Sequence, residues 1–163
     1  EVNKDSIRFM MLNRSNDVEL DFDFDKVKEK TKENPVYYVQ YAYARINSII
    51  RTLDKKLSDN ISVNLNSFSP NVYEEKILRK IFEWPKVVES ASNKYEPHKI
   101  PFYLYELSTL FHSYWSKGNE DVEFKFIENG KLKRMETLSF LYLIAIVIKN
   151  GMNILGVSTP EKM

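Results

Sequence analysis

Apolar residues recur at helical spacing along most of the chain, and residues 34–53 show the pattern most clearly. A helix turns about 100° per residue, so positions three, four and seven apart share a face. Asn34-Pro35 is typical of a helix start, since asparagine caps the first turn and proline fits its first position. We therefore expect a helix from about residue 34 to 53. Its core-facing stripe consists of Val36, Val39, Tyr43, Ile46 and Ile50.

The same spacing predicts helices elsewhere, over residues 4–13, 25–32, 70–82, a short stretch after Pro85, 96–115 and 134–149. Asn150-Gly151 is expected to end the last of these. Residues 120–133 contain an alternating segment and an Asn129-Gly130 turn, so a hairpin and a loop both stay open there. With only four glycines in 163 residues, the pattern predicts one all-α domain over residues 1–163, a bundle of about six helices.

The opposite side of the helix at 34–53 is also aromatic. Tyr38, Tyr41 and Arg45 follow one another at i, i+3 and i+7, nearly opposite the apolar stripe, and Tyr37 flanks them. Two interpretations are open. The rings and the guanidinium could stack on unpaired bases, at ~1–3 kcal/mol per base. Alternatively the tyrosines pack under a neighbouring helix with their hydroxyls at the rim, which the pattern alone favours.

A second aromatic concentration lies at 96–115. Projection onto a helix places Tyr103 on the apolar face and points Tyr105 and His112 outward. No nucleophile or second acid is patterned around His112, so a surface or hydrogen-bonded structural histidine is expected rather than a general base.

Composition limits the chemistry. The chain has no cysteine and two histidines, and it lacks glycine-rich phosphate loops and common hydrolase motifs, so we expect no catalytic residue, metal site or cofactor in it. Formal net charge is +1, so any nucleic-acid role must depend on local geometry and stacking. The longest apolar run, 140–148, is shorter than the ~20 residues that span a bilayer, and no membrane association is expected.

Six segments, in order, carry a family resemblance. NPVYYVQYAYARI at 34–46 resembles the signature that opens the C-terminal anticodon-binding (DALR-type) domain of arginyl-tRNA synthetases, which are class I enzymes. The other segments are similar to motifs of the same family: DSIRF at 5–9, LDFDFDKV at 20–27, WPKVVESA at 84–91, EPHKIPFYLYELSTLFH at 96–112 and LGVSTPEKM at 155–163.

The resemblance implies a helical anticodon-binding domain of the class I synthetase type, with residues 1–20 leading in from a catalytic domain that this chain lacks. It implies a C-terminal fragment of an arginine–tRNA ligase, and as partners the tRNA(Arg) anticodon stem-loop and the enzyme's own N-terminal catalytic domain. ATP and Mg²⁺ would bind to that parent enzyme, outside this fragment. A monomer in the cytoplasm is expected.

The family's anticodon-contacting positions fall at Tyr38, Tyr41, Arg45, Tyr103 and Met163. The helix projection disagrees at one of them, because it points Tyr105 outward instead of Tyr103. For the tail we expect Ile154, Leu155 and Val157 to act as apolar anchors that deliver Met163 beside the tyrosine helix. The alternative function is a helical protein–protein docking module that uses the same tyrosine-rich surface; unlike RNA binding, such docking should depend little on salt.

Overall fold

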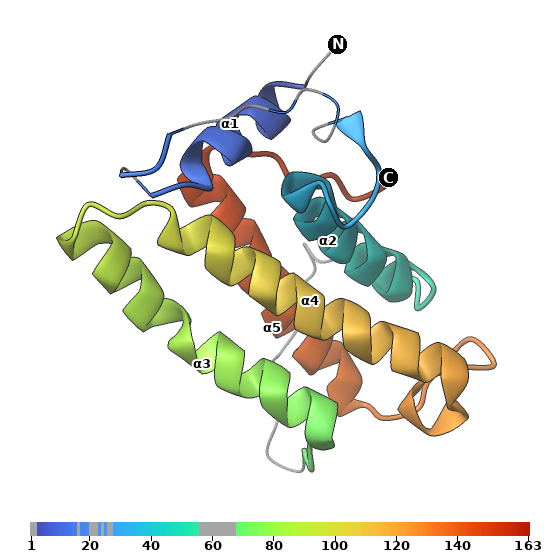
Figure 1. The fold of residues 1–163 in the computed structure, drawn as a ribbon. Coiled ribbons are helices and arrows are strands. Elements are labelled where there is room, and N and C mark those ends of the chain that lie inside the picture. The colour runs from blue at the N-terminus through green and yellow to red at the C-terminus, as the bar shows by residue number, and fades with distance from the viewer. Residues whose placement is uncertain (1–2, 16, 20–22, 24, 26–27, 56–67) are drawn as a thin grey trace.

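The computed structural model describes residues 3–15, 17–19, 23, 25, 28–55 and 68–163 (Figure 1). Five α-helices dominate the described residues: α1 Lys4–Leu12, α2 Pro35–Arg51, α3 Val72–Asn93, α4 Lys99–Glu120 and α5 Glu136–Leu155. A 3-10 turn at Val122–Phe124 and two short strands, β1 Ile127–Glu128 and β2 Lys131–Leu132, lie between α4 and α5. The all-α prediction is confirmed, with five helices among the described residues against the expected number of about six.

Helix α4 runs between α2 and α3, and α5 lies behind it (Figure 1). Both α2 and α3 pack against α4 and α5, while α1 closes one end against α2 and α5. The most apolar helix is α5, whose side chains supply the centre of the core. By length and composition α5, alone among the described helices, is apolar enough to cross a membrane. Here 56% of that apolar window is buried inside the fold, as in the core helix of a globular domain.

Helix α3 corrects the prediction of two helices separated at Pro85. It continues through Pro85 as 22 residues, starting at a capping box between Asn71 and Glu74. An interior proline costs roughly 3 kcal/mol in lost bonding and steric clash. Burial offsets that cost here, because side chains at helical spacing on both sides of Pro85 pack on the core: Ile77, Leu78, Ile81, Trp84, Val87 and Ala91.

The helix predicted at 25–32 is wrong wherever the structure describes it, since residues 28–34 form turns with a single 3-10 position. Local side-chain bonds explain the difference. The Asn34 amide donates to the Glu29 carbonyl at 2.9 Å, and the Glu33 amide donates to the Thr31 hydroxyl at 3.3 Å. Such bonds compete with helix hydrogen bonds. The acidic segment at 20–27 and the loop expected at 55–70 fall largely outside the described residues.

Helix α5 ends at Gly156 and not at Gly151. The predicted stop at Asn150-Gly151 is wrong, because α5 continues to Leu155 and ends at Gly156, whose φ of 67° is left-handed. At Gly151 an added Cβ would lie 2.7 Å from Leu104 Cδ2, so the glycine lets α4 and α5 approach closely.

The open choice between a hairpin and a loop at 120–133 resolves to a hairpin. Asn129 and Gly130, at φ 51° and 74°, form its turn, and Ile127 pairs with Leu132.

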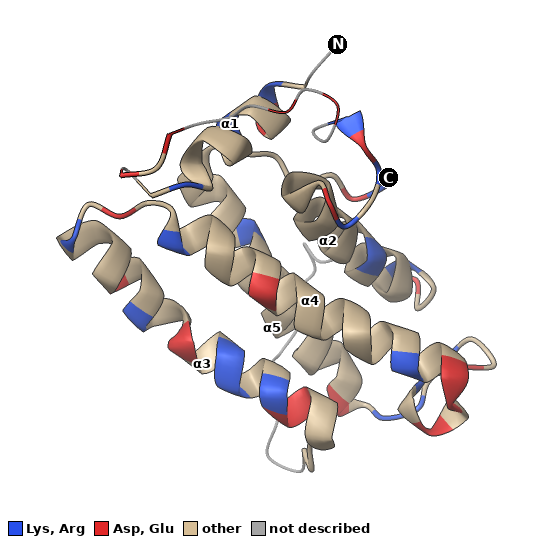
Figure 2. Cartoon of the chain, in the orientation of Figure 1, with Lys and Arg blue, Asp and Glu red and all other residues tan. Residues whose placement is uncertain are grey.

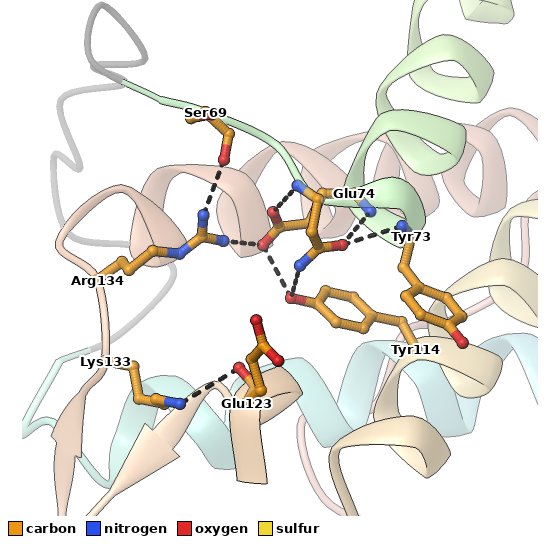
Figure 3. A network of polar contacts seen from close by, with 8 residues as sticks. Ser69, Tyr73, Glu74, Tyr114, Glu123, Lys133 and Arg134 are labelled. Carbon is orange, nitrogen blue, oxygen red and sulfur yellow. Dashed lines mark hydrogen bonds and ion pairs between the residues drawn. The ribbon is translucent and has the colours of Figure 1, made fainter. Parts of the chain in front are cut away.

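A network of polar side chains around the buried Glu74 joins α3, α4 and the segment entering α5 (Figure 3). We call its members, Asn71, Glu74, Tyr114 and Arg134, the Glu74 network. Glu74 has no exposed surface, and its carboxylate pairs with the Arg134 guanidinium. The Tyr114 hydroxyl and the Asn71 backbone amide each donate to that carboxylate at 2.9 Å. The negative charge of Glu74 is therefore fully compensated inside the fold.

Candidate nucleic-acid interface

The orientation of α2 matches the predicted apolar stripe. Its five members, Val36, Val39, Tyr43, Ile46 and Ile50, are all buried in the core. The other side of the helix keeps Tyr37, Tyr38, Tyr41 and Arg45 partly exposed. Helix α2 thus has a second aromatic side, which is separate from the side that packs in the core.

Residues of α4 complete this surface, and we call the whole set the aromatic face: Tyr37, Tyr38, Tyr41 and Arg45 of α2 with Tyr105, His112 and Trp115 of α4. Tyr37 and Tyr41 stack at 5.7 Å between ring centroids with planes 13° apart. His112 extends the array, at 5.6 Å from Tyr41 and 4.4 Å from Tyr38. Tyr105 lies 5.3 Å from Tyr38 on the other side.

Arg45 contacts three members of the aromatic face, Tyr41, His112 and Trp115. Its Cζ is 4.4 Å from the Tyr41 ring centroid and 4.8 Å from that of Trp115, within cation–π range of both. One terminal nitrogen donates to the Tyr41 hydroxyl at 2.7 Å, and the other to His112 Nδ1 at 3.1 Å. Arginine has five N–H donors, so donors remain for a ligand. In the described part of the chain, no carboxylate forms an ion pair with Arg45.

His112 lies beneath these groups and is only 6% exposed, so it is a hydrogen-bonded structural histidine rather than a surface one. Its Nε2 is 3.1 Å from the Tyr38 carbonyl oxygen, which can only accept, so Nε2 carries the proton and Nδ1 accepts from Arg45. Burial, and then the charge of Arg45, lowers the pKa of His112 to about 4, although the bond to Tyr38 opposes this. The ring is neutral at physiological pH. Burial also raises the pKa of Tyr38.

Tyr103 is not part of the aromatic face. It is 3% exposed, lies 5.2 Å from the Trp84 ring and donates its hydroxyl to the Lys80 carbonyl at 2.7 Å, between α4 and α3. Burial raises its pKa well above the usual range. Positions two apart on a helix point to nearly opposite sides, so Tyr105 contacts Tyr38 and Tyr103 cannot. The helix projection is confirmed for Tyr103 and Tyr105, but the outward position that it gave to His112 is wrong, because α2 covers that side of α4. An anticodon role for Tyr103 stays a prediction that its burial disfavours.

The C-terminal tail is tied down across α2. The Gln40 amide donates to the Ser158 carbonyl at 3.0 Å, and the Arg51 guanidinium to the Glu161 carbonyl at 2.9 Å. Leu155 and Val157 are buried as expected, whereas Ile154 is 53% exposed and is no anchor. Ile154 misses the core because it lies on the outer side of the last turn of the extended α5.

Met163 lies beside α2, the tyrosine-rich helix, as expected from the sequence. It lines a hollow of about 540 Å³ together with Tyr41, Arg45, Arg51 and Trp115. The structure thus brings four of the five predicted residues to one side of the molecule. Tyr37, Tyr105, His112 and Trp115 of the aromatic face are additions to that set. Trp115 had a sequence signal, since it lies three residues after His112 and so shares its side of α4.

The electrostatics of this side differ from the rest of the molecule. Helix α2 carries Arg45 and Arg51 and no acidic residue, while positive and negative charges are mixed along α3 (Figure 2). Among the residues that the structure describes, no group of three or more His, Asp or Glu side chains could hold a metal ion.

A family comparison decides the class of the domain. The family model of the DALR anticodon binding domain matches residues 39–163. The chain belongs to this family. Tyr41, Arg45, Tyr103 and Met163 lie within the matched part of this DALR domain, and Tyr38 precedes it by one residue.

Related proteins cover the whole DALR domain but are much longer. The arginine–tRNA ligase of Pelagibacter ubique is 55% identical over 163 residues, which are 100% of this chain and 28% of that protein. The arginine–tRNA ligase of Ruegeria pomeroyi is 42% identical, again over all of this chain and 29% of that protein. The chain therefore spans less than a third of the length of these relatives.

Solved structures agree with the fold. A putative arginyl-tRNA synthetase from Campylobacter jejuni superposes with a TM-score of 0.82 at 28% identity, covering 100% of this chain and 34% of that one. Thermus thermophilus arginyl-tRNA synthetase gives a TM-score of 0.73 at 24% identity, covering 98% of this chain and 26% of that one, and supports the fold alone. The predicted fold type is confirmed.

Proposed function

We propose that this chain is the anticodon-binding domain of an arginine–tRNA ligase and that it holds the anticodon loop of tRNA(Arg) on the aromatic face. The observation that carries the proposal is Arg45, a cation held between the rings of Tyr41 and Trp115 beside an open hollow. The family of the domain and its similarity to an arginine–tRNA ligase support the same partner.

Binding would combine stacking with charge. An anticodon loop offers unpaired bases, which stack on aromatic and guanidinium planes and are hydrogen-bonded at their edges. Tyr37 and Tyr41 offer parallel rings for stacking, and Arg45 offers donors to a base edge or a phosphate. Met163 would close the hollow with a flexible, polarizable side chain against a ring or base. Tyr38 supports the surface from a half-buried position.

The parent enzyme would join arginine to its tRNA. ATP and Mg²⁺ would bind in an N-terminal catalytic domain outside this chain, and residues 1–20 would lead in from it. Within this chain α1 packs on the domain through the buried Phe9 and through Arg8, which donates to the Leu155 carbonyl. We infer a cytoplasmic enzyme that acts as a monomer.

A filter-binding titration of this chain tests the proposal. The probes are an RNA hairpin with an arginine anticodon loop and a hairpin with the same stem and an unrelated loop. The expected result is tighter binding of the arginine hairpin, with affinity that falls as salt rises because phosphates are neutralised. Equal affinity for both hairpins would refute the proposal. An interaction that does not respond to salt would indicate the protein-docking alternative.

A further inference from the structure

His112 makes two hydrogen bonds that a side chain filling space in the core would not need. It bridges the two helices of the aromatic face, donating through Nε2 to the backbone of Tyr38 on α2 and accepting through Nδ1 from Arg45. Its ring also stacks on Tyr41 and lies tilted against Tyr38. A buried leucine would fill the same space without satisfying either polar partner.

The bond from Arg45 to His112 is one of two that define the plane of the guanidinium. The other ends on the Tyr41 hydroxyl, and the two bonds leave from different terminal nitrogens. Two such bonds, with a ring on either side, fix the rotation of a side chain that is otherwise among the most flexible. A group fixed in its bound orientation loses less entropy on binding, which strengthens the complex.

The acceptor must be neutral for this contact to form. Protonated histidine donates from both ring nitrogens, and Nδ1–H would then face an N–H of Arg45 and a second positive charge. Among the described residues, the charged and titratable groups that contact the ring are Arg45, Tyr38 and Tyr41, all from α2. None of these three is a carboxylate that would favour an imidazolium.

We propose that His112 is a positioning residue, which holds the Arg45 guanidinium in one orientation between the rings of Tyr41 and Trp115 by accepting its hydrogen bond at Nδ1. The inference rests on the proposed function, because a fixed guanidinium matters only if it meets a ligand. His112 itself is covered and touches no RNA. It acts through Arg45.

Two matched variants separate positioning from packing. In His112→Asn the side-chain oxygen takes the place of Nδ1 and still accepts from Arg45, whereas His112→Leu has nearly the same shape and no acceptor. Both variants lose the ring and the bond to Tyr38. If His112 only filled space, the leucine variant would fold and bind at least as well as the asparagine variant, because leucine is cheaper to bury. Positioning predicts the opposite order.

The measurement is the affinity of each variant for the arginine anticodon hairpin, with thermal melting as the stability control. We expect His112→Leu to bind about tenfold more weakly than His112→Asn, the effect of losing one hydrogen bond to a charged group. Its melting temperature should be equal or higher. Equal affinities of the two variants, or tighter binding by His112→Leu, would overturn the inference.

A readout without RNA keeps this test independent of the proposed function. In the free wild-type chain, NMR should resolve separate signals for the two terminal nitrogens of Arg45 and show the Nε2–H tautomer of His112. The Arg45 signals should stay separate in His112→Asn and merge in His112→Leu. Merged signals in the wild type would overturn the positioning role. Resolved signals in a wild-type chain that binds neither hairpin would instead overturn the proposed function.

Discussion

Two arginines of this domain, Arg134 and Arg45, both lie near aromatic rings, but a partner cancels the charge of only one of them. Each lies near an aromatic ring, at 5.1 Å from Phe68 for Arg134 and 4.4 Å from Tyr41 for Arg45. Arg134 pairs with the fully buried Glu74, so its charge is cancelled within the fold (Figure 3). Arg45 is held by a tyrosine hydroxyl and a neutral histidine, neither of which cancels its charge.

The difference shows that the charge of its hydrogen-bond partner, more than the rings around it, distinguishes a structural arginine from one that can bind a ligand. A carboxylate partner makes Arg134 part of a closed network that joins α3, α4 and the start of α5. Neutral partners orient Arg45 and leave its field available to an anionic ligand. The two sites therefore predict opposite responses to substitution.

The largest effect is expected at the closed site. Glu74→Ala leaves Arg134 partly buried without its counter-ion and leaves the Tyr114 hydroxyl and the Asn71 amide without their acceptor. Breaking a buried pair on one side costs about 3–5 kcal/mol, and the partial exposure of Arg134 favours the lower end. Chemical denaturation measures the loss. A Glu74→Ala variant as stable as the wild type would show that the network is dispensable.

Acid should weaken the aromatic face through His112. Its pKa is about 4 when folded against 6.5 for the free group, so between these values only the unfolded chain binds the proton. This contribution to stability is complete above pH 6.5 and is lost as the pH falls toward 4, at about 1.4 kcal/mol per pKa unit, or up to about 3 kcal/mol.

The measurement is denaturation at pH 7 and pH 4.5, with His112→Asn as the reference, because the variant keeps every other titrating group. The wild type should lose more stability than the variant on acidification. Parallel losses in the two proteins would show that His112 does not titrate in this window.

Substitutions on the two sides of α2 should have opposite effects. Tyr41→Ala removes a stacking ring and one partner of Arg45, and should weaken hairpin binding by about 1–3 kcal/mol while the helix content stays unchanged. Ile46→Ala opens a cavity in the core and should lower the free energy of unfolding by about 2–5 kcal/mol, with binding affected second. Circular dichroism and filter binding measure both quantities. If Tyr41→Ala unfolds the domain and Ile46→Ala is silent, the two sides are assigned wrongly.

The smallest effect is expected from the tail. Deleting Lys162 and Met163 leaves the anchors Val157 and Glu161 in place, so the melting temperature should barely move. Binding should weaken by about 0.3–1.5 kcal/mol, the range for a methionine on an aromatic ring. Unchanged affinity of the truncated chain for the arginine hairpin would show that Met163 does not contribute to binding.

Periodicity predicted what depends on one helix alone. The stripe on α2 and the outward Tyr105 both follow from local spacing, whereas local turn chemistry left a hairpin and a loop both open at Asn129-Gly130. Two of the features that periodicity missed depend on a second element. Pro85 stays helical because both halves of α3 pack on one core, and Gly151 is not a stop because Leu104 presses against it.

The site divides in the same way. Tyr38, Tyr41 and Arg45 could be grouped from α2 alone, whereas the place of Trp115 over Arg45 depends on how α4 crosses α2. The inward position of His112 has the same origin, because the helix projection of α4 took its outer side to be solvent where α2 in fact covers it.

The most direct test compares Arg45→Gln with Arg134→Gln for affinity toward the arginine anticodon hairpin and for melting temperature. Arg45→Gln should weaken binding by about tenfold or more, as expected for losing a charged contact, and leave the melting temperature close to that of the wild type. Arg134→Gln should lower the melting temperature and leave the affinity of the folded protein unchanged. The reverse pattern, or wild-type affinity in Arg45→Gln, would contradict the assignment of the aromatic face as the RNA-binding surface.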